Sequence, residues 1–421
     1  MQLTENDRRY VYAGLILFTF ASFKFYSYIG FNLQLLSAVF YLAQALMLGY
    51  CFRDVFNSNG NWIYAIMRYI LLITWFSIIP AWVFWNQSVP LSVVATTNLS
   101  VITLFFFLWK HDFSQKELEK YIIVLGFVYV ILWIYSLKNL PMMTFGVTNV
   151  NETTMFNEER GMLRINFVGR TSLVLTYFLF LNKSFNTRKV TYIALSVFFF
   201  IMIVFQLTRQ IIFGAGIVTI IYIFLKSKRL TAYIVGAAVA MYLFSFSFSF
   251  NKEGVVGSMI ELTKSQTKYR YEKGDNRSQE YKHFFTAYSK NVFTDVFGNG
   301  VPYSTSPYGK AEQRSNDNGY YRTDVGYASI FVTIGWVGLI LYLVLFYLCL
   351  RRKVDSNLEY AILFIGYMVI ADVMASWHTT ADGQVALATC AYILAKYGKR
   401  ENEQEYIEEE TGEQVQQCSL Q

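Results

Sequence analysis

The chain has 421 residues; 54% of them are hydrophobic, 19% are aromatic, only 15% are charged, and the formal net charge is +7. The apolar residues fall in long uncharged runs rather than in the alternating or heptad patterns of soluble strands and coiled coils. Composition and pattern together exclude a soluble enzyme, a coiled coil and a disordered chain, and they predict an all-α polytopic membrane protein.

A membrane-spanning helix needs about 20 mostly apolar residues to cross a hydrocarbon core roughly 30 Å thick. Twelve runs in the sequence meet this requirement, and the sixth, eighth and twelfth are the short ones. The predicted spans, in chain order, are residues 10–29, 33–52, 63–84, 89–109, 121–137, 167–181, 190–207, 211–225, 230–250, 325–350, 358–377 and 384–396.

The distribution of Lys and Arg predicts how these spans are oriented, because basic residues mark the cytoplasmic side of short loops. Alternate connections hold nearly all of them, whereas the intervening turns at 30–32, 86–88 and 378–383 hold none. Both termini are therefore expected in the cytoplasm, in agreement with an even number of spans, and the first span is expected to be a signal anchor. The basic residues that set this orientation are Arg8, Arg9, Arg53, Lys110, Lys116, Lys120, Lys183, Arg188, Lys189, Lys226, Lys228, Arg229, Arg351, Arg352, Lys353, Lys396, Lys399 and Arg400.

Two connections on the opposite, exoplasmic side are long, at residues 138–166 and 251–323. The second holds eleven Lys or Arg against eight Asp or Glu, which is permitted because long segments translocate largely regardless of charge. The sequence thus predicts nine spans in residues 1–250, a large, partly helical exoplasmic loop in 251–323, and three further spans in 324–397. Residues 398–421, rich in Glu, are predicted to form a disordered, acidic cytoplasmic tail.

Polar side chains near the exoplasmic span ends are the first candidates for function. Arg209 is predicted to lie in a tight turn with Thr208 and Gln210, where a planar guanidinium suits phosphate oxygens, and we favour phosphate binding over anchoring at lipid headgroups. Lys24 and Arg68 lie close to span ends, and snorkelling to the membrane interface is the favoured explanation for both.

Acidic and histidine residues gather near the end of the eleventh span. Asp372 lies close to His378 and Asp382, and two interpretations stay open: it is the structural partner of a basic residue, or it belongs to a functional site. The other histidines, His111 and His283, are too far away in sequence to suggest a metal cluster, and the four cysteines avoid the exoplasmic loops. No metal, cofactor or disulfide is therefore predicted.

The long exoplasmic loops place basic residues beside aromatic ones. Arg164 and Arg170 lead into the sixth span, and a denser group follows in the second loop. One interpretation is an amphipathic helix with a solvated basic face; the slightly favoured one is a groove in which tyrosines stack on sugars while cations hold phosphate or an acidic polysaccharide. The group in the second loop comprises Lys264, Lys268, Tyr269, Arg270, Tyr271, Lys273, Arg277, Tyr281 and Lys282.

Several short motifs occur in an order that resembles a known family. The segment Leu207-Thr208-Arg209-Gln210 is similar to the Ser-Arg turn of the O-antigen polymerase and ligase superfamily. Asn276-Arg277 followed by Phe297-Gly298-Asn299-Gly300 resembles the Gly-Arg and Gly-x-Gly pattern of its large periplasmic loop. Thr323-Asp324 before Gly335-Trp336-Val337-Gly338 resembles the loop exit and the kinked span that follows it. Twelve spans with a large loop after the ninth also match, so the resemblance covers most of the chain.

The resemblance implies a GT-C-like glycosyltransferase of the bacterial inner membrane. Its substrate would be an oligosaccharide on undecaprenyl pyrophosphate at the exoplasmic face, and its partners would be membrane lipid and a chain-length regulator, without nucleic acid or cofactor. Many ligases of the superfamily have a His at the loop exit, where this chain has Thr323-Asp324. This difference favours a Wzy-type polymerase of O-antigen, capsule or exopolysaccharide over a ligase, and a non-enzymatic lipid-oligosaccharide flippase is the third alternative.

The same resemblance implies roles for individual residues in a metal-independent transfer that inverts the anomeric carbon. Cations would stabilise the departing pyrophosphate, and a carboxylate or His would deprotonate the acceptor hydroxyl. The candidate bases are Asp324, Glu280 and His283. The candidates for binding pyrophosphate or glycan are Arg209, Arg277, Arg164, Arg170, Arg270 and Tyr281.

Overall fold

The computed structural model describes residues 5–25, 33–57, 60–138, 156–157, 162–163, 168–206, 208–226 and 276–399. The predicted ninth span, residues 400–421 of the predicted acidic tail, Arg164 and Arg270 lie outside these residues. Helices dominate, with one two-stranded antiparallel pair, β1 (Phe156–Asn157) and β2 (Met162–Leu163), in which Phe156 is opposite Leu163.

The described helices follow the predicted spans closely. Eleven of the twelve predicted spans coincide with helical segments, and the remaining one is outside the described residues. The helices are α1 (Glu5–Phe23), α2 (Leu33–Phe56), α3 (Trp62–Phe76), α4 (Ile78–Trp85), α5 (Val89–Thr97), η1 (Ser100–Thr103), α6 (Leu104–His111), α7 (Gln115–Leu137), α8 (Arg170–Thr187), α9 (Val190–Phe205), α10 (Arg209–Lys226), α13 (Asn276–Thr286), α14 (Val292–Phe297), α15 (Pro307–Asp317), η4 (Arg322–Asp324), α16 (Gly326–Leu350), η5 (Ser356–Leu358), α17 (Glu359–Ala371), η6 (Trp377–Thr379) and α18 (Ala381–Tyr397).

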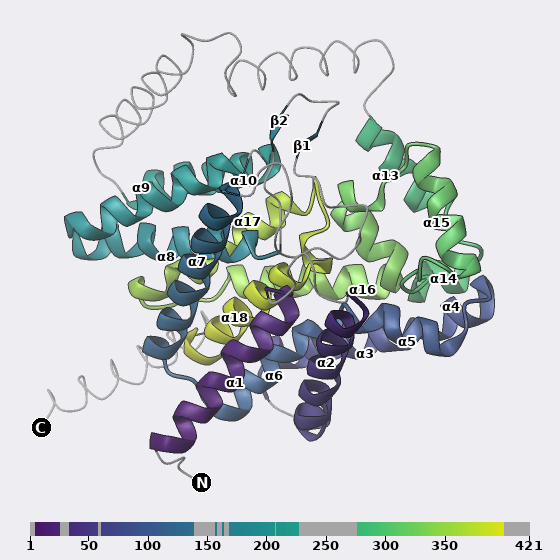
Figure 1. Cartoon of the computed structure of the whole chain (residues 1–421), viewed down its shortest axis with the longest axis horizontal. Helices are drawn as coiled ribbons and strands as arrows, with labels where there is room; N and C mark the ends of the chain where they lie inside the picture. Colours follow the sequence, from purple (N-terminus) through teal and green to yellow (C-terminus); the bar gives the residue numbers. More distant parts are fainter. Residues whose placement is uncertain are drawn as a thin grey trace, which may run out of the picture.

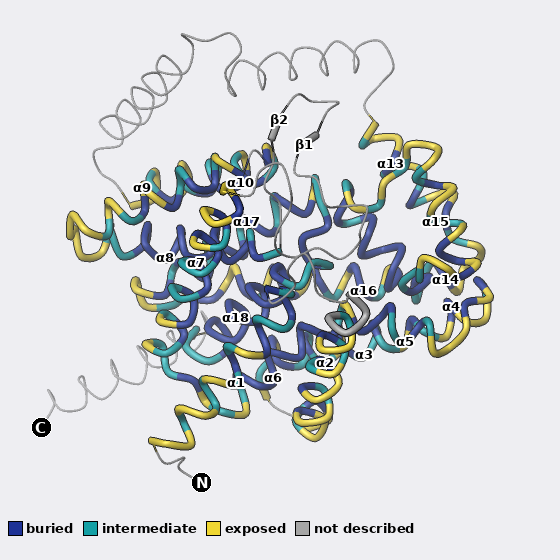
Figure 2. The backbone as a smooth tube through the Cα atoms, in the orientation of Figure 1, coloured by how far each residue is buried: buried dark blue, intermediate teal, exposed yellow. Residues whose placement is uncertain are grey.

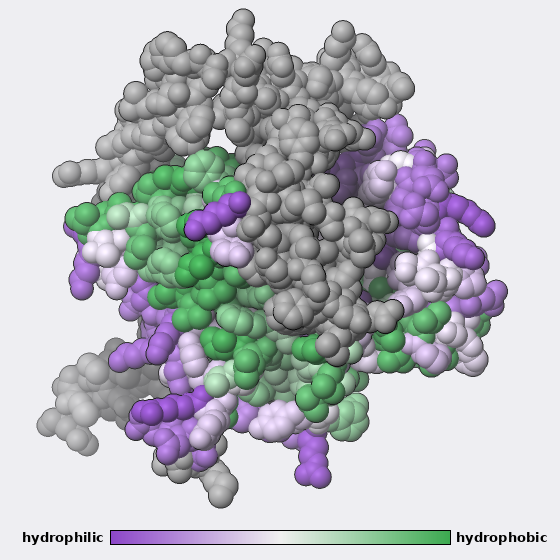
Figure 3. Space-filling model, in the orientation of Figure 1, coloured by the Kyte–Doolittle hydropathy of each residue, from purple (hydrophilic) through white to green (hydrophobic). Residues whose placement is uncertain are grey.

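The helices form a bundle with a buried centre and an apolar rim. Among the described residues, five helices are long and apolar enough to cross a membrane, or six if the bent α5–α6 pair counts as one span, so the structure supports a polytopic membrane protein without confirming twelve spans. Figure 2 shows α8, α16 and α18 as largely buried, whereas α1, α2 and α9 expose many positions. Hydrophobic surface covers much of the bundle, and hydrophilic surface covers the side formed by α13 and α15 (Figure 3).

The basic residues predicted to be cytoplasmic meet acidic residues at one end of the bundle. Arg8 contacts both Glu117 and the carbonyl of Asp112, and Asn182 reaches Glu359, so the pairs form one connected face. The pairs are Arg8–Glu117 (2.5 Å), Lys110–Asp54 (3.0 Å), Lys183–Glu119 (2.6 Å), Lys226–Glu359 (2.6 Å) and Lys396–Asp112. The helix ends that were predicted to share a side of the membrane therefore do share a face. Whether that face is cytoplasmic stays a prediction.

The predicted fourth span is not straight. α5 and the η1–α6 segment meet at an angle of 60°, which leaves backbone groups without their helical partners. The buried Gln384 of α18 supplies them: its Oε1 accepts from the N–H of Ile102 at 3.1 Å, and its Nε2 donates to the carbonyl of Asn98 at 3.2 Å. A polar side chain from a distant helix thus satisfies backbone groups at the break.

The described part of the large loop, from α13 onward, packs on a second break, in α16. Gly335 has φ 70° and ψ −171°, a conformation open only to glycine, and it confirms the kink predicted in this span. The break frees carbonyls of the preceding turn, and the loop occupies them: Asn299 N–H donates to Val332 at 2.7 Å and Gly300 N–H donates to Thr333 at 3.0 Å. Figure 1 shows α13, α14 and α15 gathered beside α16 and α4.

The turn between α4 and α5 holds the other side of this loop. Trp85 Nε1 donates to the Asn299 side-chain carbonyl at 2.9 Å. The Gln87 amide, fully buried, donates to the Val301 carbonyl at 2.9 Å and accepts from the N–H of Tyr303 at 2.8 Å. Buried amides with all their partners satisfied fix the loop rigidly against the bundle.

Candidate functional site

Two of the predicted arginines are the first residues of helices. α8 begins at Arg170 and α10 begins at Arg209, so Arg209 lies in the first helical turn and not in the three-residue turn that the sequence predicted. A cation at a helix N-terminus is unfavourable for the helix itself, because the dipole is already positive there. Guanidinium groups combined with free N–H groups at the same end make a strong site for an anion.

Arg170 links these two helix ends. Its Nη1 donates to Thr208 Oγ1 at 3.3 Å, and Thr208 directly precedes Arg209. The Arg170 guanidinium also lies 5.0 Å from the centre of the Trp377 ring, in a cation–π contact. Its buried Nε has no hydrogen-bond partner in the described part of the chain. We call Arg170, Thr208, Arg209 and Trp377 the arginine cluster.

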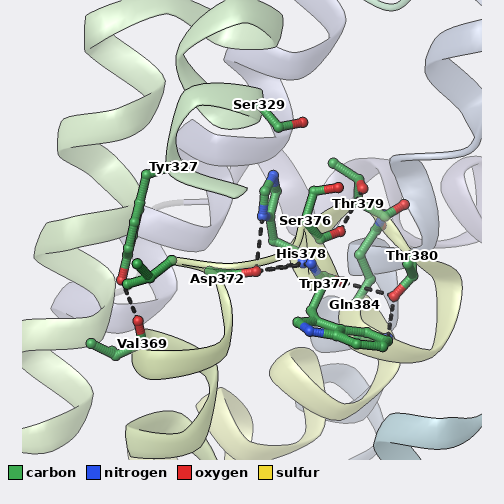
Figure 4. A network of polar contacts seen from close by, with 12 residues as sticks. Tyr327, Ser329, Val369, Asp372, Ser376, Trp377, His378, Thr379, Thr380 and Gln384 are labelled. Carbon is green, nitrogen blue, oxygen red and sulfur yellow. Dashed lines mark hydrogen bonds and ion pairs between the residues drawn. The ribbon is translucent and has the colours of Figure 1, made fainter. Parts of the chain in front are cut away.

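The turn that carries Trp377 is held by Asp372. This carboxylate is fully buried, and its Oδ1 accepts from the N–H of Trp377 at 2.8 Å and from His378 Nδ1 at 3.3 Å (Figure 4). Neither Asp372 Oδ2 nor His378 Nε2 has a hydrogen-bond partner among the residues described. Asp372 is therefore the partner of a histidine and of backbone N–H groups, and its turn forms one wall of the arginine cluster.

Asp382 joins α18 to the start of α8. The side chain is buried, and its Oδ2 accepts from the N–H of Thr171 at 3.0 Å. This N–H is one of those that a helix leaves unpaired at its beginning. The acceptor holds the N-terminus of α8 beside the turn that ends at Thr380, so Arg170 is presented from a fixed helix end.

The large loop after the predicted ninth span reaches the same turn from the other side. Tyr281 of α13 donates its hydroxyl to the carbonyl of Val373 at 2.9 Å, and burial raises its pKa to about 12. Ser376 N–H donates to the carbonyl of Thr323 at 3.0 Å, which places the neighbouring Asp324 beside the turn. Arg277 lies one helical turn before Tyr281. The structure thus brings Asp324, Tyr281 and the α13 cation to the edge of the Asp372 turn.

Glu280 and His283 serve contacts inside the loop. Glu280 is buried and accepts from the N–H of Tyr321 at 3.3 Å. His283 stacks on Tyr320 with ring centres 4.2 Å apart, and its Nε2 is 3.2 Å from Ser315 Oγ. Burial lowers the pKa of His283. Glu280 and His283 thus pack against α15 and the two tyrosines that follow it.

Sequence reasoning missed Trp377 and the role of Thr208. An aromatic residue at a predicted span end is ordinary, because Trp is common at the membrane interface, and the sequence alone gave no reason to place Arg170 over it. The available signal was the position of Trp377 between Asp372 and His378, which the sequence had singled out. Within the described ranges, no three His, Cys, Asp or Glu side chains are placed to share a metal ion.

Substitution of Asp372 tests how the turn is held. In Asp372→Ala, the N–H groups of Trp377 and His378 lose a buried acceptor, which costs about 1–3 kcal/mol per unsatisfied group. We expect a lower midpoint of thermal unfolding in detergent. We also expect tryptophan fluorescence to be quenched more readily by a soluble quencher, because Trp377 becomes more exposed to solvent. The matched control is Asp317→Ala, an exposed carboxylate of α15. Equal unfolding midpoints in the two variants would contradict this role of Asp372.

Comparison with known families covers part of this site. Residues 194–343 match the sequence profile of the O-antigen ligase family. The match runs from α9 to most of α16 and so includes Arg209, Arg277, Asp324 and Gly335. It confirms the resemblance inferred from the motifs. A search of curated proteins found no matching relative.

Proposed function

We propose that this chain, a member of the O-antigen ligase and polymerase superfamily, is a polymerase of lipid-linked oligosaccharide repeat units. It would transfer the glycan from undecaprenyl pyrophosphate to a sugar hydroxyl at the exoplasmic face of the bacterial inner membrane. The orientation follows from the basic residues that gather on the opposite face of the bundle. Donor binding from the membrane is consistent with the apolar helices that surround the site.

The arginine cluster is the observation that carries this proposal. Arg170 and Arg209 begin two helices, and Arg170 reaches Thr208 at the start of the second, so two positive helix ends that each begin with an arginine lie together. Asp382 takes one N–H of α8, and within the described residues the Arg170 guanidinium contacts a hydroxyl and an aromatic ring but forms no ion pair. A pyrophosphate suits such a site, because two oxygens of one tetrahedral phosphate can accept the paired N–H groups of a guanidinium.

The chemistry needs only charge stabilisation and proton removal. The acceptor oxygen attacks the anomeric carbon, and the bond from that carbon to the phosphate oxygen breaks. Undecaprenyl pyrophosphate leaves, and the configuration at the anomeric carbon is inverted. Arg170, Arg209 and Arg277 would stabilise the negative charge that develops on the leaving group. Arg164 and Arg270 remain candidates for further contacts. The acceptor proton passes to a base at the edge of the site.

Asp324 is our first candidate for the base, ahead of Glu280 and His283, because its neighbour Thr323 contacts the Asp372 turn. Asp324→Asn should lower turnover about 100-fold or more while leaving donor binding unchanged. The measurement is single-turnover transfer alongside binding of the lipid-linked donor. Asp317→Asn on α15 is the matched control, and an active Asp324→Asn enzyme would remove Asp324 as the base.

A ligase is the second candidate, and one observation favours it. The chain lacks the His at the loop exit, but Ser376 pairs with Thr323 and so brings the turn containing His378 to that exit. The buried His378 Nε2 has no partner in the described structure and is available as a base once the turn opens. His378→Gln should impair transfer more than Asp324→Asn if the ligase assignment is right.

Purified protein in liposomes distinguishes the alternatives. Lengthening of a lipid-linked oligosaccharide without any nucleotide sugar supports the polymerase. Transfer only to a different acceptor, such as a lipid A core, supports the ligase. Movement of the donor across the bilayer without a new glycosidic bond supports a flippase and would refute the proposed enzyme. A chain-length regulator would be expected to change the product length distribution in the first case alone.

A further inference from the structure

The end of α1 departs from the usual chemistry of a helix C-terminus. The N–H of Phe25 donates to Phe20 and the N–H of Lys24 donates to Ala21, both at 3.2 Å, which is the Schellman arrangement. The rings of Phe20 and Phe25 pack edge to face with centres 5.5 Å apart, as the apolar contact of this motif requires. Lys24 therefore occupies the left-handed position, with φ 54°.

Glycine is the usual residue at this position, because a side chain is sterically disfavoured there. Lys24 breaks this local rule, and local rules are broken most often where a side chain is needed for function. Arg188 at the end of α8 has a similar φ of 55°, but it is exposed and lies on the face that holds the other basic residues. Arg188 is thus one of the basic residues that are predicted to orient the helices. Lys24 is not, because it lies at the opposite end of α1 from Arg8, which belongs to that basic face.

The Lys24 ammonium has no anionic partner among the described residues. The side chain is half-buried, and its Nζ lies 5.0 Å from the centre of the Phe40 ring on α2. By contrast, Lys183 and Lys226 form close ion pairs with carboxylates. A half-buried cation held only by an aromatic ring retains most of its capacity to bind an anion.

The position of Lys24 connects it to the arginine cluster. The ring of its neighbour Phe25 lies against Gly169, where a Cβ would be only 3.1 Å from Phe25 Cζ. Gly169 caps the N-terminus of α8, and the next residue is Arg170. The end of α1 thus packs directly on the helix start that presents Arg170.

We propose that Lys24 is a further binding residue for a phosphate of the lipid-linked donor. This inference rests on the proposed function and extends its site to α1. Lys24 would hold a phosphate oxygen from the side of α1 and α2, while Arg170 and Arg209 hold the group from α8 and α10. A phosphate of an ordinary membrane lipid has the same chemistry, so the test must separate the two sources.

The experiment measures binding of undecaprenyl pyrophosphate to the full chain in nanodiscs, once in phosphatidylcholine and once with phosphatidylglycerol added. Lys24→Gly should weaken binding about tenfold in both lipids, and Lys24→Arg should restore most of it. Because glycine suits the left-handed position, Lys24→Gly should unfold at the same or a higher temperature than the wild type. Arg188→Gly is the matched control, because it also places glycine at a left-handed position but on the opposite face of the bundle. It should leave binding unchanged.

The outcomes separate the two proposals. If the wild type neither binds undecaprenyl pyrophosphate nor transfers glycan, the proposed function fails and the role of Lys24 fails with it. If the wild type binds and Lys24→Gly binds equally well, only the role of Lys24 is overturned, and snorkelling is the better explanation. A loss confined to discs that contain phosphatidylglycerol would assign Lys24 to a lipid headgroup and would also overturn the inference.

Discussion

Arg209→Ala, Arg277→Ala and Arg170→Ala are each expected to reduce glycan transfer by about 100- to 1,000-fold, which is the usual effect of removing one group that stabilises a developing anion. In cells, chain growth should stop although the protein remains in the membrane. The measurement is the length distribution of the surface polymer, together with the rate of transfer by purified protein in liposomes. Arg170 should also affect the unfolding temperature, because it packs on Trp377.

Lysine variants and a distant arginine serve as controls. Arg209→Lys keeps the charge but loses the planar fork, so it should recover only part of the activity. Arg314→Ala removes an exposed arginine from α15 and should behave as the wild type. Normal polymer lengths in both Arg209→Ala and Arg277→Ala would refute their assignment to the pyrophosphate.

Gly335→Ala is expected to have the largest effect on the fold. The conformation of Gly335 is closed to other residues, and a Cβ at this position would collide with the carbonyl of Val296. The substitution must either straighten α16 or push α14 away. Straightening would remove the carbonyls of Val332 and Thr333 from the loop. We expect a destabilisation of about 3 kcal/mol or more, seen as lost protease resistance of the loop.

Gly216→Ala is the matched control for this substitution. Gly216 also lies within a helix, α10, but a Cβ there would meet no atom within 4 Å. Alanine is favoured over glycine in a helix interior by about 1 kcal/mol, so the control should be neutral or slightly stabilising. If the loop resists protease equally well in Gly335→Ala and in Gly216→Ala, its structure does not depend on the break in α16.

The helices could be predicted because each depends on a local run of apolar residues, whereas the breaks within them depend on distant partners. The kink at Gly335 was visible, since its glycines are local. The bend between α5 and α6 was not, because it is completed by Gln384, which is 282 positions from Ile102. The number of spans also stays unconfirmed, because several described helices are too short to satisfy length and composition alone.

The candidate site was predictable in its charges and not in its contacts. Arg209 and Arg170 were found because few arginines occur at span ends that the sequence predicts to be exoplasmic. The cation–π contact of Arg170 and its bond to Thr208 join residues that local patterns cannot relate. Asp372 and His378 were expected to be close, but the acceptance of two backbone N–H groups by Asp372 is a feature of the folded turn. Lys24 was assigned to snorkelling because it lies close to a predicted span end, and its left-handed conformation has no sequence signature.

The contacts of Gln87 and Asn299 affect how acceptor specificity could be redesigned. Gln87 bonds the loop backbone, and Asn299 of the loop bonds a carbonyl of α16. The structure of the loop is encoded partly in α4, α5 and α16, so a loop transplanted from a relative would arrive without the surfaces that shape it. Exchanging the loop together with residues 85–92 and 329–338 would move a complete folding unit. Chimaeras built in this way should retain a protease-resistant loop. The glycosidic linkages in their products would then show whether the exchanged unit determines acceptor specificity.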